Sequence, residues 1–161
     1  MANSSPITPA GLKKLRAELR RIIEIERPKN VAEIEEARSH GDLKENAEYH
    51  AAKEMQGKLD GRMKYLRYKI NKSQVIDPIS VKADTIIFGA TVTLEDLDNE
   101  VQVIYKLVGE DESNADEGKI SITAPIARAM LGKREGDEVI VKLPKGDREY
   151  EVIKIEYKAI D

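Results

Sequence analysis

The sequence predicts an α+β protein in which an N-terminal antiparallel α-helical coiled-coil hairpin precedes a C-terminal antiparallel β domain with one short helix. In residues 1–76, apolar residues recur in steps of three and four, which is the spacing of one face of a helix. Residues 85–161 instead contain short runs rich in β-branched residues, separated by turn residues, as strands do. A stretch over residues 77–84 that includes Pro78 separates the two patterns and predicts a linker.

The first helix is expected over residues 8–39. Thr8 and Pro9 are typical of an N-cap and of the first helical position. Pro28 removes one helical hydrogen bond and predicts a kink. The apolar stripe consists of Leu12, Leu15, Leu19 and Ile22 before this proline and of Val31, Ile34 and Ala37 after it. At 1.5 Å per residue, such a helix spans roughly 48 Å.

The second helix returns after a tight turn expected at residues 40–42. Its stripe consists of Ala47, Ala51, Met55, Leu59, Met63, Leu66 and Ile70. Small residues lie nearest the turn, which suits a hairpin with a narrow tip and a better-packed base. The turn lets the chain pair with itself, so a monomer is expected, and a paired dimer stays open as an alternative.

The β domain is expected to consist of two hairpins with a short strand and a helix between them. The expected elements are strands 86–94 and 101–108, an acidic loop 109–118, strand 120–122, a helix from Pro125 to about Leu131, and strands 137–143 and 150–157.

Composition excludes several classes of function. The chain has 161 residues, of which 40% are hydrophobic, 4% aromatic and 35% charged, which suits a hairpin with little interior. It has no cysteine, so disulfides and thiol catalysis are excluded, and its two histidines, His40 and His50, are too few for a zinc site. No apolar run reaches the roughly 18 residues of a membrane span. A signal peptide is also absent from the polar start of the chain, so we expect a soluble cytoplasmic protein.

Charge differs between the two halves. Residues 1–76 carry 16 Lys and Arg against 11 Asp and Glu, whereas residues 77–161 carry 11 against 19. This asymmetry favours two surfaces that face different partners. Ordinary drift in composition is the alternative, because scattered charges screen one another.

The turn between the helices carries a pair of carboxylates, Asp42 and Glu45. One interpretation is a capping box, in which Asp42 accepts from the backbone N–H of Glu45 and Glu45 reaches back. The other is that the pair holds a hard divalent cation such as Mg²⁺, which usually takes one or two protein carboxylates. Two carboxylates are too few for a site of their own, so the other ligands would come from a second protein.

Residues around the pair add weaker signals. Arg38 and Lys44 are placed to contact a phosphate or simply to balance surface charge, and Tyr49 is placed to stack on a base or to cover the hairpin. Basic residues further down either track a nucleic-acid backbone or form a solvated face. They are Lys13, Lys14, Arg16, Arg20, Arg21, Lys58, Arg62, Lys64, Arg67 and Lys69.

Residues 36–38 (EAR) and 41–50 (GDLKENAEYH) resemble the tip of bacterial transcript-cleavage factors of the GreA/GreB family. Residues 87–92 (IFGATV), 125–133 (PIARAMLGK) and 151–157 (EVIKIEY) are similar to further segments of that family in the same order. The resemblance therefore covers nearly the whole chain.

The resemblance implies a coiled-coil hairpin and an FKBP-like β domain. It also implies a transcription elongation factor that binds bacterial RNA polymerase at its secondary channel and stimulates the polymerase's own cleavage of the nascent RNA 3′ end. By motif, Asp42 and Glu45 would hold Mg²⁺ jointly with the polymerase. Arg38, Lys44, Asn46 and Tyr49 would be accessory residues that contact RNA or polymerase.

The resemblance further implies that the turn before the short helix docks on the polymerase, through Thr123, Ala124 and Pro125. The composition argues against a prolyl isomerase role, because a chain without Trp and with Phe88 as its one Phe cannot line an aromatic pocket. Two other functions stay open: a factor that only blocks the channel, and a coiled-coil adaptor or chaperone without metal chemistry.

Overall fold

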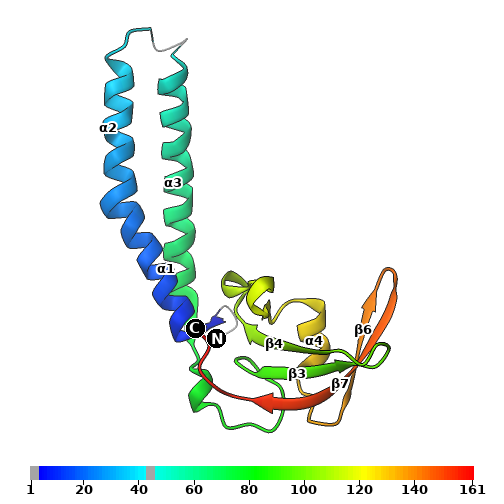
Figure 1. The fold of residues 1–161 in the computed structure, drawn as a ribbon. Coiled ribbons are helices and arrows are strands. Elements are labelled where there is room, and N and C mark those ends of the chain that lie inside the picture. The colour runs from blue at the N-terminus through cyan, green and yellow to red at the C-terminus, as the bar shows by residue number, and fades with distance from the viewer. Residues whose placement is uncertain (1–3, 43–45) are drawn as a thin grey trace. The chain divides into compact units, whose positions relative to one another are not determined.

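The protein has two compact units, which we describe separately from a computed structural model (Figure 1). The structure describes residues 4–42 and 46–161. One unit is residues 13–72, and the other combines the described residues up to Leu12 with residues 73–161. The boundaries expected from the sequence at 76 and 84 stay a prediction.

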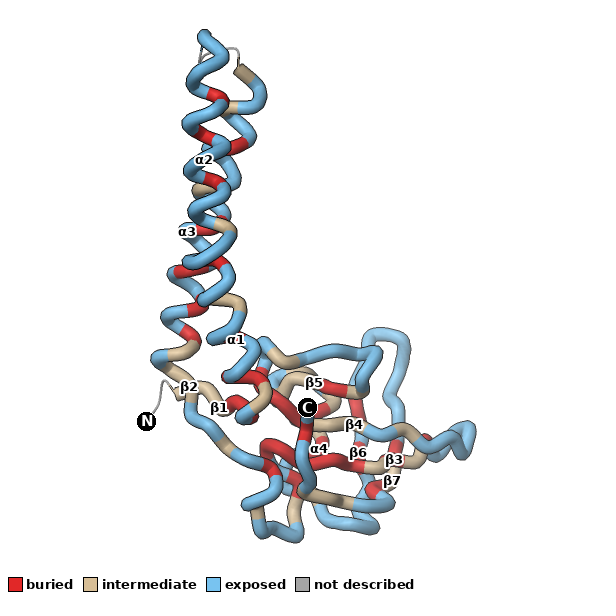
Figure 2. Tube along the Cα trace, turned by 60° about the vertical axis from the view of Figure 1, so that its left-hand side comes forward, coloured by how far each residue is buried: buried red, intermediate tan, exposed pale blue. Residues whose placement is uncertain are grey.

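The first unit is a helical hairpin. Its first arm consists of α1 (Pro9–Arg21), a five-residue π-turn, η1 (Ile22–Glu26), and α2 (Arg27–Arg38). Its second arm is α3 (Ala47–Lys72). The arms are antiparallel, because Glu18 contacts Arg62 whereas Ala37 contacts Asn46 near the other end. Buried residues form a narrow seam between the arms (Figure 2).

The π-turn keeps the buried residues before and after it on the same face of the first arm. Ile22 and Ile34 are both buried. Twelve residues of regular α-helix turn through about 1,200°, which is about 120° beyond three full turns. In η1 the N–H of Arg27 donates to the carbonyl of Ile22, five residues back, and this wider turn takes up about one residue.

As a result, the residue of this region that faces α3 is Asn30, not Val31. Asn30 is 3% exposed and Val31 is 47% exposed. The prediction that Val31 lies on the seam was wrong, because it assumed that only apolar residues continue the stripe. The expected kink near Pro28 takes the form of the π-turn directly before it.

For α3, the predicted apolar stripe matches the buried residues in the lower part of the helix and is wrong near the tip. Leu59, Met63 and Leu66 are buried as expected. Near the tip Ala52 is buried, whereas Ala51 and Met55 are exposed. Adjacent alanines at 51 and 52 gave no sequence signal for which of them faces the other arm.

The second unit is built on a five-stranded sheet in the order β5-β4-β3-β7-β6. The strands are β3 (Thr91–Asp96), β4 (Gln102–Val108), β5 (Lys119–Ser121), β6 (Glu138–Leu143) and β7 (Gly146–Glu156). β4 and β5 pair in parallel, so the expected all-antiparallel sheet was wrong at this edge. The short helix α4 (Pro125–Met130) covers the core with Ala127 and Met130.

A second, two-stranded sheet was not expected. β1 (Ser5–Ile7) pairs in parallel with β2 (Ser73–Val75). The short 3₁₀ turn η2 (Pro78–Ser80) follows, with the side chain of Asp77 accepting from the N–H of Ile79. Strand β3 begins five residues later than predicted at 86, because residues 87–90 form a turn in which Gly89 has a φ of +88°.

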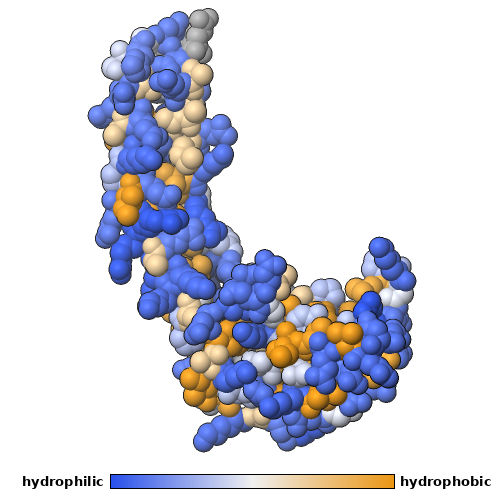
Figure 3. Space-filling model, viewed as in Figure 1, coloured by the Kyte–Doolittle hydropathy of each residue, from blue (hydrophilic) through white to orange (hydrophobic). Residues whose placement is uncertain are grey.

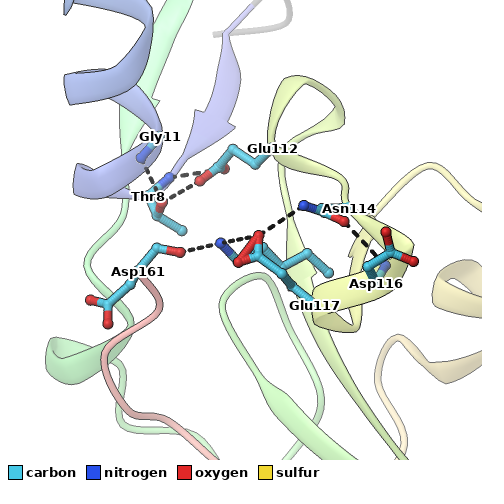
Figure 4. A network of polar contacts seen from close by, with 8 residues as sticks. Thr8, Gly11, Glu112, Asn114, Asp116, Glu117 and Asp161 are labelled. Atoms are coloured by element: carbon cyan, nitrogen blue, oxygen red, sulfur yellow. Dashed lines mark hydrogen bonds and ion pairs between the residues drawn. The ribbon is translucent and has the colours of Figure 1, made fainter.

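The first residues of α1, up to Leu12, belong to the second unit. An acidic loop of that unit holds the start of the helix (Figure 4). Thr8 is the N-cap, since its hydroxyl accepts from the N–H of Gly11 at 3.1 Å. Glu112, in the 3₁₀ turn η3 (Glu110–Glu112), accepts from the hydroxyl and from the N–H of Thr8 and also from the N–H of Gly109. A second 3₁₀ turn, η4 (Ala115–Glu117), is capped by Asn114.

Within the described residues, no helix combines the length and the apolar content that crossing a bilayer would require.

Candidate functional site at the hairpin tip

The first arm ends in a tightening turn. The N–H groups of Ser39 and His40 donate to carbonyls of the last turn of α2, and the Ser39 hydroxyl donates to the carbonyl of Glu36 at 2.6 Å. Gly41 then adopts a φ of +109°, a conformation that glycine reaches without steric cost. This places the exposed Asp42 just beyond the end of the arm.

Asn46 holds the start of the second arm. Its Oδ1 accepts from the N–H of Tyr49 at 3.0 Å, which makes it the N-cap of α3. Its Nδ2 donates to the carbonyl of Ala37 at 2.7 Å. One side chain therefore caps one helix and satisfies the end of the other.

This geometry contradicts one interpretation of Asp42, that it caps the second helix. The capping box requires Asp42 at the N-cap, but α3 begins at Ala47 and its cap is Asn46. The prediction that Asp42 caps the second helix is therefore wrong. The Asp42 carboxylate is not used for starting α3.

The predicted accessory residues are partly brought together. The Arg38 guanidinium lies 6.0 Å from the centre of the Tyr49 ring, and the Tyr49 and His50 rings meet edge to face at 5.6 Å. Arg38, Asn46 and Tyr49 thus lie close together near the tip. Lys44 and Glu45 lie outside the described residues.

The tip offers a hard oxygen donor but not a complete metal site. Among residues 4–42 and 46–161, no group of three or more His, Cys, Asp or Glu side chains is placed to bind a metal. An exposed carboxylate such as that of Asp42 suits Mg²⁺ as one ligand of several. The chemistry of this donor fits a site completed by another molecule.

A groove of about 440 Å³ runs beside the tip between the two arms. Exposed glutamates border it and alanines form its floor. Its lining residues are Glu33, Glu36, Ala37, Glu48, Ala51, Ala52 and Met55. No sequence pattern indicated this groove, which exists because small residues fill the seam there.

Some of the basic residues lower on the hairpin form ion pairs with glutamates. Arg62 binds Glu18 through two hydrogen bonds of 2.6 and 2.8 Å, and Arg21 pairs with Glu26 at 3.7 Å. Lys69 is 8% exposed and so does not belong to an exposed basic surface. The remaining cations contribute to a mainly hydrophilic surface (Figure 3).

The predicted docking turn lies between β5 and α4. The Ser121 hydroxyl accepts from the N–H of Thr123 and lies 2.7 Å from the Thr123 hydroxyl. Ala124 is the N-cap residue of α4 and Pro125 is its first residue. The turn is thus fixed by local hydrogen bonds, with Thr123 and Pro125 exposed.

Comparisons with known proteins cover both units. A family model described as "Transcription elongation factor, N-terminal" matches residues 5–75, and one described as "Transcription elongation factor, GreA/GreB, C-term" matches residues 81–157. Two proteins described as transcription elongation factor GreA are similar to the chain. They come from Francisella tularensis subsp. novicida (strain U112) and subsp. tularensis (strain SCHU S4 / Schu 4). Each is 52% identical over 160 residues, which cover 98% of this chain and 100% of the relative.

Among solved structures, the crystal structure of GreA factor homolog 1 (Gfh1) of Thermus thermophilus is 27% identical with a TM-score of 0.44. The match covers 95% of this chain and 99% of that chain.

Proposed function

The chain belongs to the GreA/GreB family of transcription elongation factors, and from this premise we propose that it stimulates RNA cleavage by bacterial RNA polymerase. The hairpin enters the secondary channel of the polymerase, and the tip reaches the catalytic centre. The polymerase's own site then cleaves the nascent RNA near its 3′ end in backtracked or arrested complexes, which allows elongation to resume. The factor turns over no substrate alone.

The observation that carries this proposal is the division of roles at the tip. Asn46 caps α3 and binds the end of α2. The N-cap of α3 is therefore formed by Asn46 and not by the exposed Asp42. A carboxylate needed for folding would be less suited to leave its protein contacts for a metal ion.

Asp42 and Glu45 supply oxygen ligands in this proposal, and the polymerase supplies the others. Bound Mg²⁺ would lower the pKa of its water and stabilise charge on the attacking oxygen. Arg38 and Tyr49 lie together near the tip, where a cation and an aromatic face suit a phosphate and a base. Lys44 would add a second cation to the RNA or polymerase contact.

Docking is assigned to the turn of Thr123, Ala124 and Pro125. Its local hydrogen bonds fix the backbone, so an exposed partner surface binds it with little loss of conformational entropy. The FKBP-like description of this unit, the coiled-coil description of the hairpin and a monomeric state in the cytoplasm belong to the same proposal.

The test is cleavage of labelled RNA in stalled, backtracked bacterial elongation complexes at saturating factor. Asp42→Asn and Glu45→Gln should each lower the cleavage rate by at least tenfold while binding to polymerase persists. Glu48→Gln, at an exposed glutamate in the first turn of α3, is the matched control and should cleave like the wild type.

Two results would contradict the proposal. A wild-type factor that binds without stimulating cleavage would be a channel blocker. Variants at Asp42 and Glu45 that cleave as fast as the wild type would make the tip carboxylates irrelevant and favour an adaptor without metal chemistry.

A further inference from the structure

Asn30 places a polar group in the middle of the apolar seam. It is 3% exposed, and its Nδ2 donates to the backbone carbonyl of Ala52 on the opposite arm at 2.9 Å. The π-turn brings Asn30 to this position, as the phase of Ile22 and Ile34 shows. A buried Asn in a helical seam costs stability relative to an apolar residue, and its best-attested use is to fix register.

Packing alone fixes the register weakly at this level. A hollow of about 150 Å³ opens beside Asn30, and the groove near the tip adjoins it through shared lining by Glu33 and Met55. Apolar contact is non-directional, and the small Ala37 and Ala52 side chains interlock little. Sliding of one arm by one helical turn, about 5.4 Å, is therefore opposed less by Ala37 and Ala52 than by the larger buried Ile34 and Leu59.

The hydrogen bond of Asn30 does have a direction. Sliding the arms breaks it and leaves the buried Nδ2 of Asn30 without this partner. Asn46 binds Ala37 at the tip, and lower down Arg27 pairs with Asp60 and Arg62 with Glu18. Unlike these exposed ion pairs, the contact made by Asn30 is buried.

We propose that Asn30 is a positioning residue, which fixes the axial register of the two arms and thereby the height at which Asp42 is presented. The claim about the height of Asp42 rests on the proposed function. The register itself is a property of the isolated protein.

The register is tested first without polymerase. The chain has no cysteine, so spin labels attach only at Glu35→Cys and Lys53→Cys, two exposed positions on opposite arms that are offset along the hairpin. We expect one narrow distance distribution for the otherwise native chain. In Asn30→Leu we expect a broader distribution or one shifted by about 5 Å. An unchanged distribution would overturn the proposal.

Asn30→Leu should fold, because the hollow lined by Met55 and Leu59 has room for the larger side chain. Its thermal midpoint should equal or exceed that of the wild type. Asn71→Leu makes the same chemical change at an exposed position in the last turn of α3 and is the matched control.

The function is then measured by titrating factor into backtracked complexes. For Asn30→Leu we expect a half-saturating concentration within about twofold of the wild type and a plateau cleavage rate about tenfold lower, equivalent to about 1.4 kcal/mol. A plateau rate equal to the wild type would overturn the positioning role. Absence of cleavage by the wild type would instead contradict the proposed function and leave the spin-label result intact.

Discussion

The carboxylate of Glu112 accepts hydrogen bonds from both the N–H and the hydroxyl of Thr8, a residue 104 positions earlier in the chain. The same Thr8 hydroxyl accepts from the N–H of Gly11. Glu112 therefore orients the N-cap of α1, and its negative charge lies near the helix N-terminus, where it is stabilising.

Glu112→Gln should lower the free energy of unfolding by about 1 to 2 kcal/mol, because the amide loses the charge and one of the two accepting oxygens. Urea unfolding at neutral pH measures the change. Glu138→Gln, at an exposed position of β6, is the control and should unfold like the wild type. Equal stability of both variants would show that the contact with Thr8 contributes nothing.

Asp96 should make stability depend on acid pH. The N–H of Asp98 donates to Asp96 and, together with the ion pair to Arg148, holds the pKa of the Asp96 carboxyl below its ordinary value of 3.8, although burial opposes this. The folded pKa is below the unfolded one. The carboxylate therefore stabilises the fold above the unfolded pKa, and this stabilisation is lost as the pH falls through the folded pKa.

Asp96→Asn should accordingly be less stable than the wild type at neutral pH, and the difference should shrink in acid, as the pH falls below the ordinary carboxyl pKa of 3.8 and through the lower folded pKa. Urea midpoints at both pH values give the answer. Asp98→Asn leaves the donating backbone N–H in place and is the control. A difference that stays constant with pH would contradict this assignment.

Substitutions at Asn46 separate its two roles, which are to cap α3 and to bind the carbonyl of Ala37. Asn46→Ser keeps an oxygen that can cap α3 but is too short to reach the carbonyl of Ala37, and it should cost about 1 kcal/mol. Asn46→Ala removes the cap as well and should cost about 1 kcal/mol more. Hydrogen exchange at the N–H of Tyr49 should be slow in the wild type and in Asn46→Ser and faster in Asn46→Ala. Equal exchange in the two variants would rule out the capping role.

The π-turn should tolerate loss of one residue. Deleting the exposed Ile25 converts η1 into a regular α-helix and keeps Asn30 and Ile34 on the seam, so thermal stability should be retained. Deleting Arg16 from the regular part of α1 instead turns Leu15 by about 100° off the seam and should cost about 2 kcal/mol. Circular dichroism during heating compares the two. Equal losses would show that η1 holds no extra residue.

Sequence periodicity predicted the hairpin and most strands because large residues such as Leu59, Met63 and Leu66 repeat at helical spacing. It misplaced Val31 and Met55, since a π-turn and neighbouring alanines change which residue faces inward without changing the composition. The pairing of β1 with β2 was missed because a three-residue strand carries almost no periodic signal.

For the site, the sequence predicted where the tip lies, and the structure brings Arg38, Asn46 and Tyr49 together there. It could not assign the cap, because Asp42 and Asn46 are both good N-cap residues and only the start of α3 distinguishes them. Asn30 carried no signal at all, since a lone Asn among charged residues is typical of an exposed helix face.

The parallel pairing of β1 with β2 has a consequence for synthesis on the ribosome. Ser5 finds its partner only after Ser73 has been made, and Thr8 finds Glu112 later still. The arms of the hairpin can meet during this interval, since residues 13–72 form a compact unit of their own. Nascent chains arrested at successive lengths should therefore show residues 5–12 becoming protease-resistant only after Glu112 has emerged. Residues 5–12 are thus fixed in place only after a residue 104 positions beyond Thr8 has been made.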